Sequence, residues 1–532
     1  MTELVSAISI ERQDKKNITM AALIQGVFTL ISRIAGMVRD VMISHIFGAN
    51  LITDAFNVAF TIPNVLRRFS GEGGFAVVFV PVYFSTLKDG QEREAKQFYR
   101  DAFGLLLVTL IIITSLGILF SSSLVGMFAA GFIDNPEQFE LTTLMTKGLF
   151  PYVFMVSLVA LFGSYLQCHR RFAMMAAAPI MLNLGMIAAM LWGGSYFSVP
   201  ILVLVVGVLV GGFFQVLLMA WALKRENLWA WPSFSLSTPS MQRMLKLLGP
   251  ALFGVLVYQL NIVILRQFAS FLGEGQISYY YNADRLTQFA TGIFGVSIAT
   301  AALPELSRGI AQFGESAFFS TLRFTLSITS FVITPCAVGL SVFAEPIISV
   351  LYVHGAFGPD DALMTAKTLM AFAPSLIPFS LSRPIIQAFY AQNNTRLPVL
   401  VGVITVFVNL ILGLFLVRYE VVGLALTLSI SSCVQYFLLL ILFKRKCLSH
   451  FEPRILKPFL GHLGVAAGAC CVGLFVQKLG HWELGFSIKN MLVLGLTAGA
   501  AGLSYLSLSW FCNFPEARKL VEGLKLRLFN RF

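Results

Sequence analysis

The chain has 532 residues, of which 57% are hydrophobic and only 12% are charged, and its formal net charge is +12. A soluble chain would be about a quarter charged. Apolar runs of about 18 or more residues recur from end to end, and each is long enough to cross the hydrocarbon core of a bilayer. This composition excludes an ordinary soluble protein and predicts an all-α polytopic membrane protein.

Motifs of enzymes and of metal or nucleotide sites are missing from the sequence. The seven cysteines form no CxxC pair, and no HExxH, P-loop or GxSxG motif occurs. We therefore expect no enzyme, no cofactor and no metal site, with the cysteines acting as small apolar residues. The first sixteen residues are polar and end in ERQDKK, so no cleavable signal peptide is expected.

Apolar runs and their polar interruptions predict fourteen transmembrane helices. Their approximate limits are 18–46, 53–86, 97–129, 138–166, 172–193, 199–222, 239–271, 276–307, 315–343, 359–389, 396–417, 421–443, 456–477 and 488–512. Most of the 38 Lys and Arg fall in loops on the side of the N-terminus, which predicts that both termini are cytoplasmic. The positive charge is thereby explained without nucleic acid as a partner.

An internal repeat is indicated by prolines. Pro81 and Pro304 end the second and eighth spans, Pro151 and Pro374 lie in the fourth and tenth, and both pairs are 223 residues apart. The offset predicts two six-helix lobes in parallel pseudo-repeat around a central cavity, plus two extra C-terminal helices. The expected parts are a polar leader (1–17), N-lobe (18–222), cytoplasmic linker (223–238), C-lobe (239–443), a helix pair forming a lipid-tail groove (444–512) and a basic tail (513–532).

Cations outnumber acids within the predicted spans. A charged side chain at mid-membrane is costly and normally faces a wet, functional cavity. Arginine pairs well with phosphate oxygens, so this excess predicts a cavity for a phosphate-bearing ligand. The cations are Arg33, Arg39, Arg67, Arg68, Arg266, Arg285, Lys367 and Arg383, and the acids are Asp40, Asp54, Glu72, Asp284 and Glu305.

The first two spans hold the densest group of these charges. Arg33 and Asp40 are seven residues apart and share a helical face, and Arg39 lies about 120° round from Arg33. Gly71, Gly73 and Gly74 surround Glu72 and predict a flexible break in the second span.

The competing interpretation is structural ion pairing of these arginines with Asp40, Asp54, Glu72 and Asp284. In that interpretation Arg68 pairs with Glu72, four residues on. Arg266, Lys367 and Arg383 lie where a cation can extend to the membrane surface, which leaves Arg33, Arg39 and Arg285 as the strongest candidates to face a ligand.

The joined motifs SRIAGMVRD (32–40), FGAN and TDAF (47–56), PNVLRR and EGGF (63–75), FVPV (79–82), YYNADRL (280–286) and ALPELS (302–307) resemble those of the MurJ (MviN) lipid II flippases of bacteria. The resemblance implies the multidrug/oligosaccharidyl-lipid/polysaccharide exporter fold. It also implies transport of lipid II, the undecaprenyl-diphosphate-linked peptidoglycan precursor, across the bacterial inner membrane for cell wall synthesis. The implied partners are lipid II, membrane lipids and the peptidoglycan synthesis machinery.

Matched motif to motif, the resemblance places the substrate-binding residues at Arg33, Arg39, Arg67, Arg285 and Asp54. The supporting residues are Ser32, Asp40, Arg68, Glu72 and Asp284. Arg266 matches no motif of the family.

Other functions remain open from the sequence. A flippase for another polyprenyl-diphosphate-linked glycan would share the diphosphate site. A multidrug or cation antiporter of the same superfamily would require a cavity dominated by carboxylates. A membrane glycosyl or phosphosugar transferase would require paired acids or an Asp cluster. No DDxxD-type cluster occurs, because Asp360 and Asp361 have no further acids beside them in the sequence. A scaffold would not need so many intramembrane cations.

Overall fold

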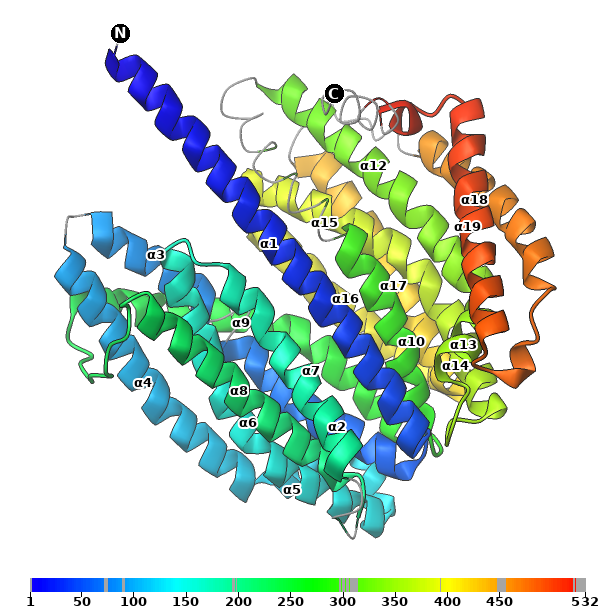
Figure 1. The fold of residues 1–532 in the computed structure, drawn as a ribbon, viewed down its shortest axis with the longest axis horizontal. Coiled ribbons are helices and arrows are strands. Elements are labelled where there is room, and N and C mark those ends of the chain that lie inside the picture. The colour runs from blue at the N-terminus through cyan, green and yellow to red at the C-terminus, as the bar shows by residue number, and fades with distance from the viewer. Residues whose placement is uncertain are drawn as a thin grey trace. The chain divides into compact units, whose positions relative to one another are not determined.

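The computed structural model describes residues 2–70, 75–88, 91–193, 197, 199–295, 298, 302, 306, 314–392, 394–446, 456–519 and 522. Within these ranges the regular structure is helical, apart from an isolated bridge between His354 and Phe357. The chain forms two compact units (Figure 1). Unit 1 comprises Met1–Ile43 and Leu51–Val263, and unit 2 comprises Ser44–Asn50 and Ile264–Phe532.

Unit 1 is built mainly from the helices α1 to α9 and the short 3-10 helix η1. They are α1 (Thr2–Phe47), α2 (Leu51–Ser70), α3 (Phe75–Lys88), α4 (Glu92–Leu119), α5 (Ser121–Phe128), η1 (Ala130–Asp134), α6 (Pro136–Cys168), α7 (Ala173–Gly193), α8 (Leu202–Arg225) and α9 (Pro239–Ser270). The unit boundaries fall inside α1 and inside α9, so each of these helices contributes to both units.

Helix α6 forms the centre of unit 1. It begins where the Asn135 side chain accepts a hydrogen bond from the Gln138 backbone N–H at 3.3 Å, and Pro136 occupies the first turn. Most of α6 is buried, and it packs against α2, α4 and α8. One end of the core is aromatic, with the Tyr99 and Tyr165 rings stacked at 3.7 Å between centroids. Such packing makes α6 and its neighbours a firm support for side chains from α1 and α2.

Unit 2 contains the remaining helices. They are α10 (Gln276–Ala290), the π-helical turn η3 (Thr291–Gly295), α12 (Glu315–Val342), α13 (Ala344–Tyr352), α14 (Pro359–Phe372), η5 (Ala373–Ser375), α15 (Leu376–Ala391), α16 (Arg396–Leu416), η6 (Val417–Tyr419), α17 (Glu420–Lys446), α18 (Leu456–Gln477), η7 (Trp482–Leu484) and α19 (Ile488–Phe511).

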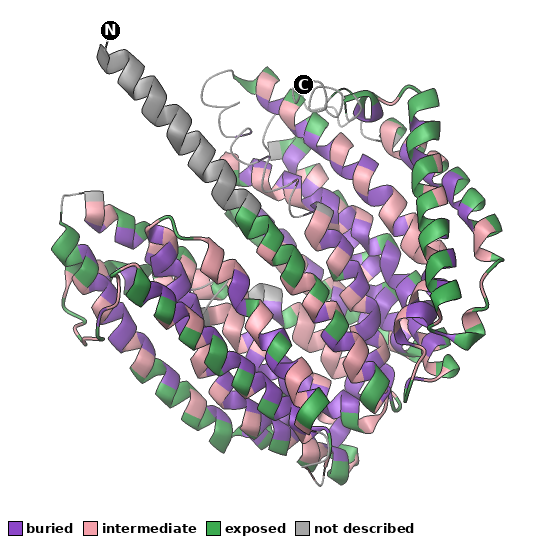
Figure 2. Cartoon of the chain, in the orientation of Figure 1, coloured by how far each residue is buried: buried purple, intermediate pink, exposed green. Residues whose placement is uncertain are grey.

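Within unit 2, helices α18 and α19 pack against α12. The Tyr505 hydroxyl donates to the Phe331 carbonyl oxygen at 2.8 Å, and Ser330 Oγ lies 3.1 Å from His462 Nδ1. Away from this contact, apolar side chains of α19 are exposed, Phe511 to 80% and Leu503 to 70% (Figure 2). In water such a surface would promote association, whereas in a bilayer it meets lipid.

Within the described ranges, nine helical segments are long and apolar enough to cross a membrane. This agrees with the predicted all-helical polytopic membrane protein. Several predicted spans consist of more than one helix: 53–86 corresponds to α2 and α3, and 359–389 to α14, η5 and α15. Prolines explain part of this segmentation, because Pro374 lies in η5, where the helix tightens. Gly71, Glu72, Gly73, Gly74 and Glu305 lie outside the described residues, so the hinge remains a prediction.

Candidate functional site

Arg39 and Asp40 form a buried ion pair on α1. Arg39 Nε and Nη2 donate to Asp40 Oδ1 at 2.9 and 2.6 Å. Arg39 is 4% exposed and Asp40 is 1% exposed. The guanidinium therefore lies within unit 1 with its charge balanced by the adjacent carboxylate. This is the geometry of the ion-pair interpretation, and contact of Arg39 with a ligand stays a prediction.

The structure adds Asn183 of α7, which sequence reasoning missed. Its Oδ1 accepts from Arg39 Nη1 at 3.0 Å, and its Nδ2 donates to the Ser32 carbonyl oxygen at 3.0 Å. Asn183 is 5% exposed. The available signal was a single amide within the apolar run MLNLGM, because polar side chains in transmembrane helices commonly hold neighbouring helices. Ser32 and Arg39 thus both bind Asn183 of another helix, and Asp40 belongs to the same group through its ion pair with Arg39.

Arg33 lies next to Ser32 on α1 and is half-buried. Asp54, at 2% exposed, is in the first turn of α2, where a negative charge is favoured by the helix dipole. Arg67 and Arg68 are in the last turn of the same helix, where positive charge is favoured. The two ends of α2 therefore stabilise the charges that the sequence places there.

Arg68 contacts α9. Its Nη1 donates to Gln259 Oε1 at 3.1 Å, and Gln259 Nε2 donates to the Val65 carbonyl oxygen at 3.4 Å. Gln259 is 1% exposed, so this amide fastens the end of α2 to α9 inside unit 1. The predicted partner Glu72 lies outside the described residues.

In unit 2, Asp284 and Arg285 are half-buried neighbours on α10. Asp284 Oδ2 accepts from Gln288 Nε2 at 2.6 Å, one helical turn further on. Arg266 places its Cζ 5.9 Å from the centre of the Tyr281 ring, a cation–π contact. This contact gives Arg266 a packing role, in line with its lack of a family motif.

The other two intramembrane cations differ in their surroundings. Lys367 is exposed on α14, while Arg383 on α15 places its Cζ 4.8 Å from the centre of the Phe379 ring.

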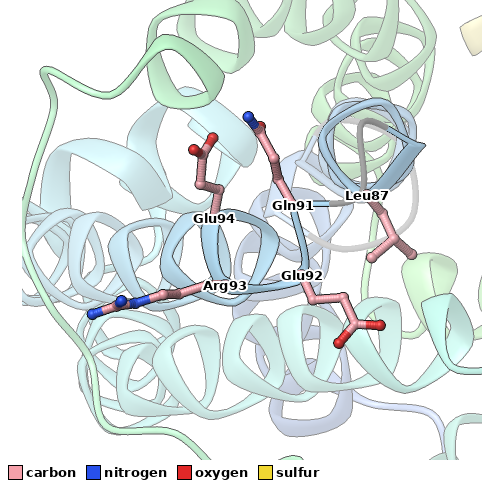
Figure 3. Close-up of a pocket in the computed structure, with 5 residues that line it drawn as sticks. All are labelled: Leu87, Gln91, Glu92, Arg93 and Glu94. Carbon is pink, nitrogen blue, oxygen red and sulfur yellow. The ribbon is translucent and has the colours of Figure 1, made fainter.

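A surface hollow of about 500 Å³ lies where α3 meets α4 and is lined by Leu87, Gln91, Glu92, Arg93 and Glu94. Figure 3 shows Glu92, Arg93 and Glu94 pointing in different directions. Because the charged groups do not converge, the hollow offers no defined ligand site. It includes none of the predicted site residues.

The sequence model of a family described as "Lipid II flippase MurJ" matches residues 43–493. The chain belongs to the MurJ family. Arg67 and Arg285 lie inside the matched residues, and Arg33 and Arg39 lie just before them. The predicted family membership is confirmed, and with it a family of multi-pass membrane transporters instead of enzymes.

Relatives in the MurJ family cover nearly the whole chain. A probable lipid II flippase MurJ of Buchnera aphidicola is 35% identical over 482 residues, which is 90% of this chain and 94% of the relative. The corresponding protein of Vibrio cholerae is 33% identical, covering 93% and 96%. The lipid II flippase MurJ of Burkholderia cenocepacia is 32% identical, covering 88% and 90%.

Solved structures show the same fold. A lipid II flippase MurJ in an inward closed conformation superposes with a TM-score of 0.77 at 25% identity, covering 94% of this chain and 100% of that chain. An inward-facing multidrug resistance MATE family transporter of the MOP superfamily superposes with a TM-score of 0.63 at 11% identity, covering 84% and 98%. The MATE likeness supports the superfamily fold only.

Proposed function

We propose that this MurJ family member moves lipid II from the inner to the outer leaflet of the bacterial cytoplasmic membrane by alternating access. The observation that carries the proposal is the family match, which spans most of the chain and includes the arginines of α2 and α10. In this proposal twelve of fourteen helices form an N-lobe (18–222) and a C-lobe (239–443), and the last two (444–512) provide a groove for the polyprenyl tail. Both termini are cytoplasmic.

The diphosphate of lipid II is bound by Arg33, Arg39, Arg67 and Arg285, with Asp54 contacting polar groups of the headgroup. Arginine suits this task because its guanidinium keeps its charge and pairs with two phosphate oxygens at once. Half-burial of Arg33 and Arg285 supports their role, since each is partly desolvated yet reachable. Their charge acts more strongly there than on a fully hydrated surface.

The chain also offers a matched pair for testing the arginine assignment. Arg285→Ala should abolish flipping of lipid II by the reconstituted protein, while Arg266→Ala, which removes a cation held over an aromatic ring, should retain it. Thermal unfolding of both variants serves as the folding control. Full translocation by the Arg285 variant would refute its assignment.

Depletion of the protein in its host tests the substrate. Lipid II should accumulate in the inner leaflet and the cells should lyse. Drug sensitivity with normal wall synthesis would instead favour an antiporter, and accumulation of a different polyprenyl-diphosphate glycan would favour the related flippase. The peptidoglycan synthesis machinery is the proposed consumer of the translocated lipid.

A further inference from the structure

Helices α7 and α8 form a closely packed pair in unit 1. A methyl group added at Gly185 of α7 would lie 2.6 Å from the Gly211 Cα of α8, and one added at Gly207 would lie 2.8 Å from the Met186 Cα. These distances involve backbone atoms, so the close approach depends on glycine. Small residues that let two backbones meet are a common device for stable helix pairs in membranes. The α7–α8 pair is therefore a rigid base for side chains that project from it.

Asn183 and Met186 project from one face of this base toward α1. Besides the two bonds of Asn183, Arg39 Nη1 lies 3.8 Å from Met186 Sδ. Ser32 and Arg39 are seven residues apart, which is about two helical turns on one face of α1. A single amide therefore holds both the backbone and a side chain of α1.

Among the described side chains of α1, buried residues first appear close to the point where Asn183 binds it. Val27 is 55% exposed and Ile34 is 50% exposed, whereas Gly36, Arg39 and Asp40 are buried. The polar bridge thus marks the place where α1 becomes attached within unit 1.

We propose that Asn183 is a positioning residue for lipid II transport, which fixes the Arg39 guanidinium and the axial position of α1. The proposal rests on the proposed function and deepens it. Asp40 accepts from Nε and Nη2 of Arg39, and the Asn183 oxygen accepts from Nη1, so the amide holds a third nitrogen of the guanidinium. The bond to the Ser32 carbonyl places the neighbouring Arg33 as well. Asn183 itself need not touch the substrate.

Lipid II affinity of purified protein in nanodiscs, measured by native mass spectrometry, tests the proposal. Asn183→Leu, which is similar in size but cannot hydrogen-bond, should weaken lipid II binding about tenfold, because a misplaced Arg39 loses about one charge-assisted hydrogen bond to the ligand. Asn183→Gln keeps the amide and should recover part of the affinity. The matched control is Gln215→Leu, because Gln215 donates to the Ala178 carbonyl at 3.0 Å between α8 and α7 without reaching α1.

A double-mutant cycle with Arg39→Ala separates positioning from a structural role. If Asn183 acts through Arg39, the loss caused by Asn183→Leu should be much smaller in the Arg39→Ala background than in the wild-type chain. Equal losses in both backgrounds would overturn the proposal, as would wild-type affinity in Asn183→Leu or equal losses in Asn183→Leu and Gln215→Leu. Should Asn183→Leu fail to fold, the Asn183→Gln cycle answers the same question.

The same measurements distinguish failure of the proposed function from failure of the role assigned to Asn183. Wild-type protein that shows no preference for lipid II over an uncharged polyprenol would refute the proposed function, whatever the variants do. Wild-type preference that is lost in Arg33→Ala but unchanged in Asn183→Leu would refute only the role of Asn183.

Discussion

Substitution of Asp40 by Leu removes the counter-charge of a buried arginine. Arg39 is 4% exposed and donates twice to Asp40 Oδ1, so the guanidinium would keep its charge in a site from which water is largely excluded. Asn183 Oδ1 accepts from Arg39 Nη1 but carries no charge, so it does not replace the carboxylate. Breaking a buried pair by removing one partner typically costs about 3–5 kcal/mol. We expect Asp40→Leu to lower the free energy of unfolding by about that amount.

The matched variant removes both charges. Replacement of a buried pair by apolar residues of similar size is often neutral or stabilising. Arg39→Met combined with Asp40→Leu should therefore recover most of the stability lost in Asp40→Leu, but it should not restore lipid II transport. Thermal unfolding in detergent, followed by the fraction of monodisperse protein, measures the first effect, and growth of a depleted host measures the second. A loss below about 1 kcal/mol in Asp40→Leu, or a double variant as unstable as the single one, would refute the reasoning.

Two further predictions concern the helix pair and a pair of histidines. Gly211→Ala would place a methyl group 2.7 Å from the Leu182 Cα, and we expect a loss of about 1–3 kcal/mol by thermal unfolding, whereas Gly249→Ala meets no atom within 4 Å and should be neutral or stabilising. The rings of His45 and His354 stack at 4.8 Å, and burial, together with the His45 imidazole, holds the pKa of His354 below its ordinary value of 6.5. This contact should therefore be at full strength above pH 6.5 and be lost as pH falls, so His354→Phe should reduce the loss of thermal stability between about pH 7 and pH 5, and an unchanged pH profile would contradict the prediction.

The sequence was sufficient to predict those features whose physical cause lies within a short stretch of the chain. An apolar run long enough to cross the bilayer must be helical, because its backbone polar groups have no other partners in lipid. That argument alone predicted the all-helical polytopic class, and the joined motifs around Arg33, Arg67 and Arg285 predicted the family. Helical spacing also placed Arg33 and Asp40 on one face of α1, since side-chain direction follows residue number within a helix.

The division of the predicted spans into separate helices could not be predicted from the sequence. The run 359–389 reads as one apolar helix, yet the structure divides it at η5 into α14 and α15. Hydropathy depends only on composition. It therefore does not detect the change in hydrogen bonding that tightens the helical turn near Pro374. For the same reason the sequence did not show that α9 contributes to two compact units.

The partners of the charged residues were decided by tertiary structure. Asp40 follows Arg39 directly, so their pairing could be anticipated, but Asn183 is 144 residues away and reaches Arg39 only because the fold brings this part of α7 to α1. Gln259 is likewise 191 residues from Arg68. An amide in an apolar run shows that some partner exists, whereas its identity depends on which helices pack together. The sequence determined which charges enter the membrane, and the packing of α7, α8 and α9 determined how Arg39 and Arg68 are held there.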